Sequence, residues 1–107
     1  MSESRESYKR TLKEFSKRVK HEYGDKILDI ILYGSAARGE PGKESDIDVA
    51  VVFSGDTFDA WKRISAIAFD VLLETGHYIS VQILEPRDLK RKTPYIKSVL
   101  NEGVHVI

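Results

Sequence analysis

Cysteine is absent from the 107-residue chain, and so are long apolar runs. Without cysteine the chain forms neither a disulfide nor a thiolate metal site, which fits a reducing compartment. The longest unbroken apolar run spans residues 49–53, far below the roughly 20 residues that a membrane span requires. No apolar run of the secretory type follows the first residues. We therefore expect a cytoplasmic protein that makes no use of a membrane.

Asparagine, glutamine and methionine occur once each, whereas charged residues make up 32% of the chain, a balance typical of thermophiles. The formal net charge is zero, which argues against a dedicated nucleic-acid binder, because such proteins are usually strongly basic. The charges are unevenly spread, because residues 27–84 are acidic and both ends are basic. An acidic centre suits a carboxylate site for a metal, although most of these charges are expected to be solvated helix faces.

Hydrophobic spacing predicts the elements of one domain over residues 1–107. Helices are expected at about residues 3–23, at 57–74 and from 94 to 102, and strands at 26–33, 47–53 and 79–84. Residues 104–107 are a candidate edge strand, and the expected helix ends are Gly24, Gly76 and Gly103. The residues expected on the buried sides of the first two helices are Tyr8, Leu12, Phe15, Val19 and Tyr23, then Trp61, Ile64, Ala68 and Val71.

The lengths of the connections predict the topology of the sheet. A short loop joins the first two strands, so they should be antiparallel, whereas a long helix joins the second and third, so these should be parallel. The end of the first strand and the starts of the other two then share one end of the sheet. We expect an α/β fold of the α+β type, with a mixed sheet covered by helices.

Gly34 and Ser35 follow the first strand and can hold a phosphate. Glycine allows a phosphate to approach the backbone, and the Ser35 hydroxyl and the N–H groups of a following turn (residues 35–38) can bind its oxygens. Arg38 can add charge-assisted hydrogen bonds. Taken alone, the Gly-Ser pair is more often an ordinary turn.

Asp46 and Asp48 lie at the start of the second strand. Residues i and i+2 of a strand share a face, so the two carboxylates should converge. Their mutual repulsion is relieved by a divalent cation such as Mg²⁺ or Mn²⁺, which takes carboxylate and phosphate oxygens. The alternative is a pair of solvated aspartates, although the apolar run after Asp48 places the pair at a structured edge.

The two features together are far more specific than either alone. Residues 32–40 (LYGSAARGE) and 44–51 (ESDIDVAV) resemble the polymerase-beta-like nucleotidyltransferase superfamily. The likeness is strongest to the small stand-alone members called minimal nucleotidyltransferases (MNT), and it extends over nearly the whole chain. The resemblance implies the polymerase-beta-like nucleotidyltransferase fold.

The resemblance also implies an activity and a set of site residues. Metal binding and catalysis would fall to Asp46 and Asp48, and nucleotide phosphates would contact Gly34, Ser35 and Arg38. The implied reaction is transfer of a nucleoside monophosphate, usually AMP from ATP, to an acceptor with release of pyrophosphate. Paired metal ions would hold the attacking and leaving oxygens.

One departure from the family pattern concerns its third carboxylate, at the start of the next strand. That position falls on Ser80, or less well on Gln82, and neither is acidic. Glu74 or His77 could reach in from the preceding segment, although His77 is more readily explained as a loop residue. Glu85 follows the strand at its other end, about 16 Å from Ser80. The nucleotide half of the site is expected to be intact and the acceptor half incomplete.

Two functions remain open at this stage. The first is an enzyme that transfers AMP. The second is a nucleotide-binding module, weakly active or inactive, that works by binding a partner protein. In the family, small members often pair with a helical HEPN protein as antitoxin and toxin, and a homodimer is also compatible with the chain. The histidines have no metal-like spacing, and the basic run Lys90–Lys92 is expected to be a solvated surface or a contact for an acidic partner.

Overall fold

The fold follows the expected order of helices and strands. A computed structural model describes residues 2–34, 37 and 47–106. Its elements are α1 (Ser2–Tyr23), η1 (Gly24–Lys26), β1 (Ile27–Tyr33), β2 (Ile47–Phe53), α2 (Thr57–Thr75), β3 (Ile79–Leu84), η2 (Pro86–Lys90), α3 (Pro94–Glu102) and β4 (Val104–His105). The predicted turn at residues 35–38 and the loop after it lie largely outside the described residues.

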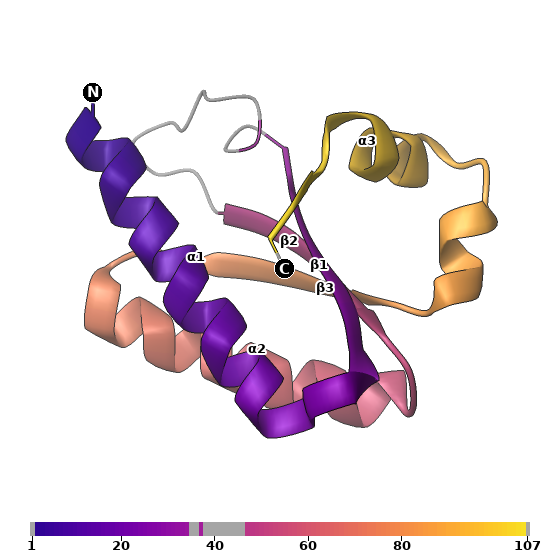
Figure 1. The fold of residues 1–107 in the computed structure, drawn as a ribbon, viewed down its shortest axis with the longest axis horizontal. Helices are drawn as coiled ribbons and strands as arrows, with labels where there is room; N and C mark the ends of the chain where they lie inside the picture. The colour runs from indigo at the N-terminus through magenta and orange to yellow at the C-terminus, as the bar shows by residue number, and fades with distance from the viewer. Residues whose placement is uncertain (1, 35–36, 38–46, 107) are drawn as a thin grey trace.

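The sheet is mixed and has the strand order β3-β2-β1-β4 (Figure 1). β2 is antiparallel to β1 and parallel to β3, as the connection lengths predict. β4 pairs antiparallel with β1 at Ile31 and Leu32, so the predicted edge strand is confirmed, although only Val104 and His105 form it. The α+β class with a mixed sheet and flanking helices is therefore the observed one.

Two hydrophobic layers cover the two faces of the sheet. One face packs against α1 and α2, which lie side by side in Figure 1 and bury Phe15, Val19 and Ile64 completely. The other face packs against α3, through Ile31, Ala50 and Val52 of the sheet and Ile96 and Val99 of the helix. β2 is buried on both sides because it is an interior strand, which explains its continuous apolar run.

Local signals in the sequence explain where the helices begin and end. The Asp56 carboxylate accepts hydrogen bonds from the N–H groups of Phe58 and Asp59 and so caps the start of α2. Gly76 ends α2 in the left-handed conformation at φ 81°. The Thr93 hydroxyl caps α3 by accepting from the Ile96 N–H at 3.1 Å, as predicted. None of the described helices is long and apolar enough to cross a membrane.

One local prediction is wrong, and another is confirmed with a backbone conformation that differs from the usual one. Trp61 was expected on the buried side of α2, yet 48% of it is exposed, and Ala60 occupies the buried position instead. Gly103 ends α3, but its backbone is extended (φ −69°) and not left-handed. Glycine is needed there for space, because a Cβ at Gly103 would overlap the Val99 carbonyl oxygen and the Ile31 side chain.

Candidate nucleotide and metal site

The candidate site is built around Asp48, at the end of the sheet where β1 stops and β2 begins. In the strand register, Asp48 lies opposite Tyr33 of β1 on one side and opposite Ser80 of β3 on the other. Alternation along β2 puts the Asp48 side chain on the same face as Ala50 and Val52, the face that α3 covers. The predicted meeting of the three strand ends is confirmed by this register.

Gly34 follows β1 and lies directly against the Asp48 carboxylate. Its φ of 77° is in the left-handed region, which glycine adopts without strain. A Cβ at this position would come within 2.5 Å of Asp48 Oδ2, closer than real side chains approach. The glycine therefore serves two purposes, since it turns the chain out of the strand and leaves the carboxylate oxygen room.

Three of the predicted site residues cannot be placed beside this pair. Ser35, Arg38 and Asp46 lie outside the described residues, so their predicted roles stay predictions. The structure does bring together Gly34, Asp48 and the non-acidic position Ser80.

Ser80 is at the level of Asp48, and its side chain is partly buried. Gln82 pairs with Ala50, one step further along the same face, and is exposed. The register therefore assigns the position beside Asp48 to Ser80 and not to Gln82. Within the described part of the chain, no group of three or more His, Cys, Asp or Glu side chains could hold a metal ion.

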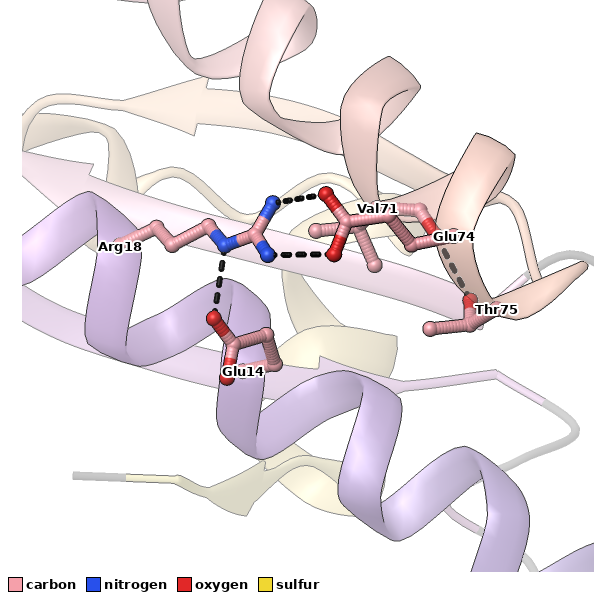
Figure 2. A network of polar contacts seen from close by, with 5 residues as sticks. All are labelled: Glu14, Arg18, Val71, Glu74 and Thr75. Carbon is pink, nitrogen blue, oxygen red and sulfur yellow. Dashed lines mark hydrogen bonds and ion pairs between the residues drawn. The ribbon is translucent and has the colours of Figure 1, made fainter.

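Glu74 does not supply the carboxylate that Ser80 lacks. Figure 2 shows its side chain directed to Arg18 of α1, whose two terminal nitrogens bind the two carboxylate oxygens at 3.0 and 2.6 Å. Arg18 Nε also donates to Glu14 at 2.7 Å. The hydrogen bonds from Arg18 hold the pKa of Glu74 below its usual value. The expectation that Glu74 reaches into the site is therefore wrong, because its charge is neutralised between α1 and α2.

A pair of tyrosines that the sequence analysis overlooked borders the Asp48 face. Tyr95, at the start of α3, donates a hydrogen bond from its hydroxyl to the Tyr33 hydroxyl at 3.1 Å. The two rings meet edge to face, with centroids 5.5 Å apart. Tyr33 lies next to Gly34 in the sequence, which could have drawn attention to it, whereas only the packing of α3 brings Tyr95 there.

Both tyrosine hydroxyls have a pKa raised above the ordinary value of 10. Burial is the main cause that raises the pKa of Tyr95, with further contributions from the Tyr33 hydrogen bond and the negative charge of Asp48. Burial also raises the pKa of Tyr33, where the hydrogen bond from Tyr95 acts in the opposite direction. Neutral hydroxyls beside a carboxylate can donate hydrogen bonds to an anionic ligand without adding charge.

Comparison with known proteins supports the sequence-based resemblance. A family model described as a nucleotidyltransferase domain matches residues 12–106. This chain belongs to the nucleotidyltransferase domain family. The match includes every described residue of the site, from Gly34 through Asp48 and Ser80 to Tyr95.

Several similar proteins come from Methanocaldococcus jannaschii and are provisionally named protein adenylyltransferases. One is 35% identical over 94 residues, with 83% of this chain matched, and the chain spans only 64% of that relative's length. Another is 36% identical over 97 residues, covering 88% of this chain and 92% of the relative.

Solved structures below 25% identity support the fold alone. A provisionally named nucleotidyltransferase from Sulfolobus solfataricus has a TM-score of 0.61 and 20% identity, covering 96% of this chain and 82% of that one. A chain from a toxin–antitoxin structure with AMP-PNP has a TM-score of 0.58 and 20% identity, covering 87% and 70%. The polymerase-beta-like arrangement expected from the sequence is thus the nucleotidyltransferase fold that these neighbours share.

Proposed function

We propose that the protein transfers AMP from ATP to an acceptor on a partner protein, in a reaction that depends on Mg²⁺ or Mn²⁺. The observation that carries the proposal is Gly34 packed against the Asp48 carboxylate where β1 and β2 meet. Two further facts support it. The similar proteins are named protein adenylyltransferases, and one structural neighbour contains a tri-AMPylated HEPN toxin from Shewanella oneidensis in complex with an MNT antitoxin.

The residues present fit a hard divalent cation. Asp48 offers carboxylate oxygens, and glycine at position 34 avoids the overlap with Oδ2 that a side chain there would cause. Asp46, two residues earlier, would be the second ligand by strand alternation. When bound, such ions would neutralise the triphosphate charge and hold its oxygens in position for transfer.

Residues of this chain would bind and orient the nucleotide. Ser35 and Arg38 would bind the phosphate oxygens after Gly34. The acceptor hydroxyl oxygen would form a bond to the α-phosphorus and release its proton to solvent, while the bond from that phosphorus to the oxygen bridging to the β-phosphate breaks and pyrophosphate leaves. The protonated hydroxyl pair of Tyr33 and Tyr95 lies beside Asp48 and could donate to the bound nucleotide.

The partner we propose is a small helical protein of the HEPN type. This partner would present the acceptor hydroxyl to the bound nucleotide. Neighbours of this fold occur in toxin–antitoxin complexes, one of them with the nucleotide analogue AMP-PNP. An antitoxin could act by modifying such a partner.

A second candidate is a nucleotide-binding module that acts on its partner by binding. The observation that favours it is the strand register, in which the non-acidic Ser80 lies opposite Asp48, the level at which the family resemblance implies a third carboxylate. Without an acid there, activation of the acceptor hydroxyl would be weak. The two candidates share nucleotide binding and differ only in transfer.

Radiolabelled ATP separates the two candidates. The protein is incubated with α-labelled ATP, Mg²⁺ and a helical partner protein, and label on the partner is measured beside ATP affinity by calorimetry. If the wild type transfers label to the partner and the variants Asp48→Asn and Asp46→Ala do not, the enzyme is supported. ATP binding without transfer supports the module. If ATP does not bind at all, both candidates are contradicted.

Arg38→Ala should weaken the binding of ATP by about 1.5–3 kcal/mol, because it removes charge-assisted hydrogen bonds to the phosphates.

A further inference from the structure

The outermost surface of α2 is apolar, although it faces away from the core of the domain. Phe58 and Leu73 are each 70% exposed, Phe69 is 53% exposed, and Trp61 is 48% exposed. The opposite side of the same helix buries Ala60, Ile64, Ala68 and Val71. The core of the domain needs only one apolar side of this helix, so the second apolar side is left exposed. Exposed apolar patches of this kind mark association surfaces.

Helical spacing gathers Phe58, Phe69 and Leu73 into one stripe, whereas Trp61 lies at its flank, about 60° around the helix from Phe58. Steps of three, four, seven and eight residues return to the same face of a helix. From Phe58 the stripe passes Lys62 and Ala66 to Phe69 and Leu73. The Lys62 ammonium lies 5.6 Å from the centre of the Phe58 ring, which keeps this cation within the apolar stripe.

The charges and large side chains of the stripe are complementary to those of a second copy that runs antiparallel to it. Ala66 lies at its middle, with Lys62 four residues before it and Asp70 four residues after it. Large apolar side chains, Phe58 and Leu73, stand near its two ends. A second α2 packed antiparallel across Ala66 would therefore place each Lys62 level with Asp70 of the other copy, and Phe58 near Leu73.

We propose that α2 forms an antiparallel, two-fold symmetric interface with a second copy of this chain, centred on Ala66. Symmetric pairing of one surface patch with itself is the commonest form of association in soluble proteins. The small side chains of Ser65 and Ala66 allow the two helices to approach closely. The Lys62–Asp70 pairs occur twice and favour this orientation, because a parallel pairing would bring like charges together.

Cysteine cross-linking tests both the contact and its direction. The chain has no cysteine of its own, so each introduced thiol can report a single position. Ala66→Cys should give a disulfide-linked dimer on mild oxidation, because its two copies lie across the two-fold axis. In the antiparallel arrangement two copies of Phe58→Cys lie about 24 Å apart and should not join, whereas a mixture of Phe58→Cys and Leu73→Cys should.

Sedimentation measures the strength of the contact. Phe69→Glu should weaken dimerisation at least about tenfold. Leu100→Glu, a matched change at an exposed leucine of α3, should leave it unaltered. Lys62→Glu should also weaken the dimer, and adding Asp70→Lys should restore most of it. Far-ultraviolet circular dichroism verifies that the variants remain folded.

Three results would overturn the proposal. The first is a wild-type protein that stays monomeric up to several hundred micromolar. The second is cross-linking of Phe58→Cys with itself, which would mean a parallel contact. The third is a protein that stays monomeric and uses the stripe to bind a helical partner instead, so that Phe69→Glu abolishes the complex with that partner. None of these bears on nucleotide binding, which is measured separately.

Discussion

Gly34 is the residue whose replacement should report most directly on the site. An alanine there must adopt φ 77° and place its Cβ against Asp48 Oδ2. We expect Gly34→Ala to lower the free energy of unfolding by about 2 kcal/mol, measured by urea titration. Gly24→Ala is the matched control, because Gly24 also has a positive φ (57°) but open space around it. It should cost only about 1 kcal/mol.

The contact itself is isolated by a double variant. In Gly34→Ala/Asp48→Ala the clashing carboxylate is gone and only the backbone strain remains, so part of the lost stability should return. If the Gly34→Ala and Gly24→Ala variants are equally stable, or if the double variant recovers nothing, close packing against Asp48 is not the reason for glycine at this position.

Ser80 is the residue that should limit the rate of transfer. Because Ser80 lies level with Asp48, a carboxylate there can complete the metal site on the acceptor side. We expect Ser80→Asp to tighten the binding of the divalent cation and to raise the rate of pyrophosphate release across a Mg²⁺ titration. Gln82→Asp is the control, since it lies about 7 Å further along the strand.

The outcome of this comparison tests the register as well as the chemistry. Equal rates for wild type and Ser80→Asp would mean that the acceptor side is already complete by other residues. A gain in Gln82→Asp and none in Ser80→Asp would mean that the strand alignment around Asp48 is shifted by two residues.

Between the elements, the ion pair of Arg18 with Glu74 links α1 to α2 and makes that contact sensitive to acid. The Glu74 pKa is lower in the folded protein than its ordinary value of 4.5 because of Arg18. The folded state therefore gains stability above about pH 4.5, and loses it as the pH falls through the lowered pKa. The effect is small, because the pair is largely exposed to solvent.

Melting curves check this sign. The melting temperature of wild type should exceed that of Glu74→Gln at pH 7, and the difference should shrink as the pH falls below 4.5 and the Glu74 carboxylate takes up a proton. Asp25→Asn, a change at an exposed carboxylate in η1, serves as control and should not show this convergence. A difference between wild type and Glu74→Gln that stays constant through acid titration of the folded protein would mean that packing, and not charge, links the helices.

The elements were largely predictable, whereas their finer contacts were not. The helical stripe of α1, the apolar run of β2 and the caps at Gly76 and Thr93 are local signals, and the structure confirms them. Trp61 lies seven residues before the buried Ala68, at the edge of the side of α2 that faces the core, and the hydrophobic pattern alone could not say that nearly half of its large side chain stays exposed. A contact between α3 and β1 determines the role of Gly103, and such a contact leaves no local pattern.

For the whole molecule, the candidate site is predictable only where neighbouring strands form it. Connection lengths alone predict that Gly34, Asp48 and Ser80 share one end of the sheet. Tyr95 is 62 residues from Tyr33 in the sequence, and it reaches the site because α3 packs on the face of the sheet that carries Asp48. The partnership of Glu74 with Arg18 likewise depends on how two helices pack.

Binding of the metal–nucleotide complex should stabilise the entire domain. A ligand that binds only the folded state adds roughly 2.7 kcal/mol at a hundredfold excess over its dissociation constant, which for a domain of this size raises the melting temperature by about 10 °C or more. We expect Mg²⁺ and ATP together to produce such a shift in wild type. A chelator of divalent cations should remove it.

Asp48→Ala should abolish this shift, because it removes the carboxylate on which the cation would depend. Without metal the variant should melt no lower than wild type, since losing one of two repelling carboxylates relieves electrostatic strain. Asp25→Ala is the control and should keep the full shift. Asp25 lies in η1, before the start of β1, at the opposite end of the sheet from Asp48. An undiminished shift in Asp48→Ala would contradict the metal site. A large fall of its melting temperature in metal-free buffer would show instead that Asp48 stabilises the fold through its contacts with neighbouring strands.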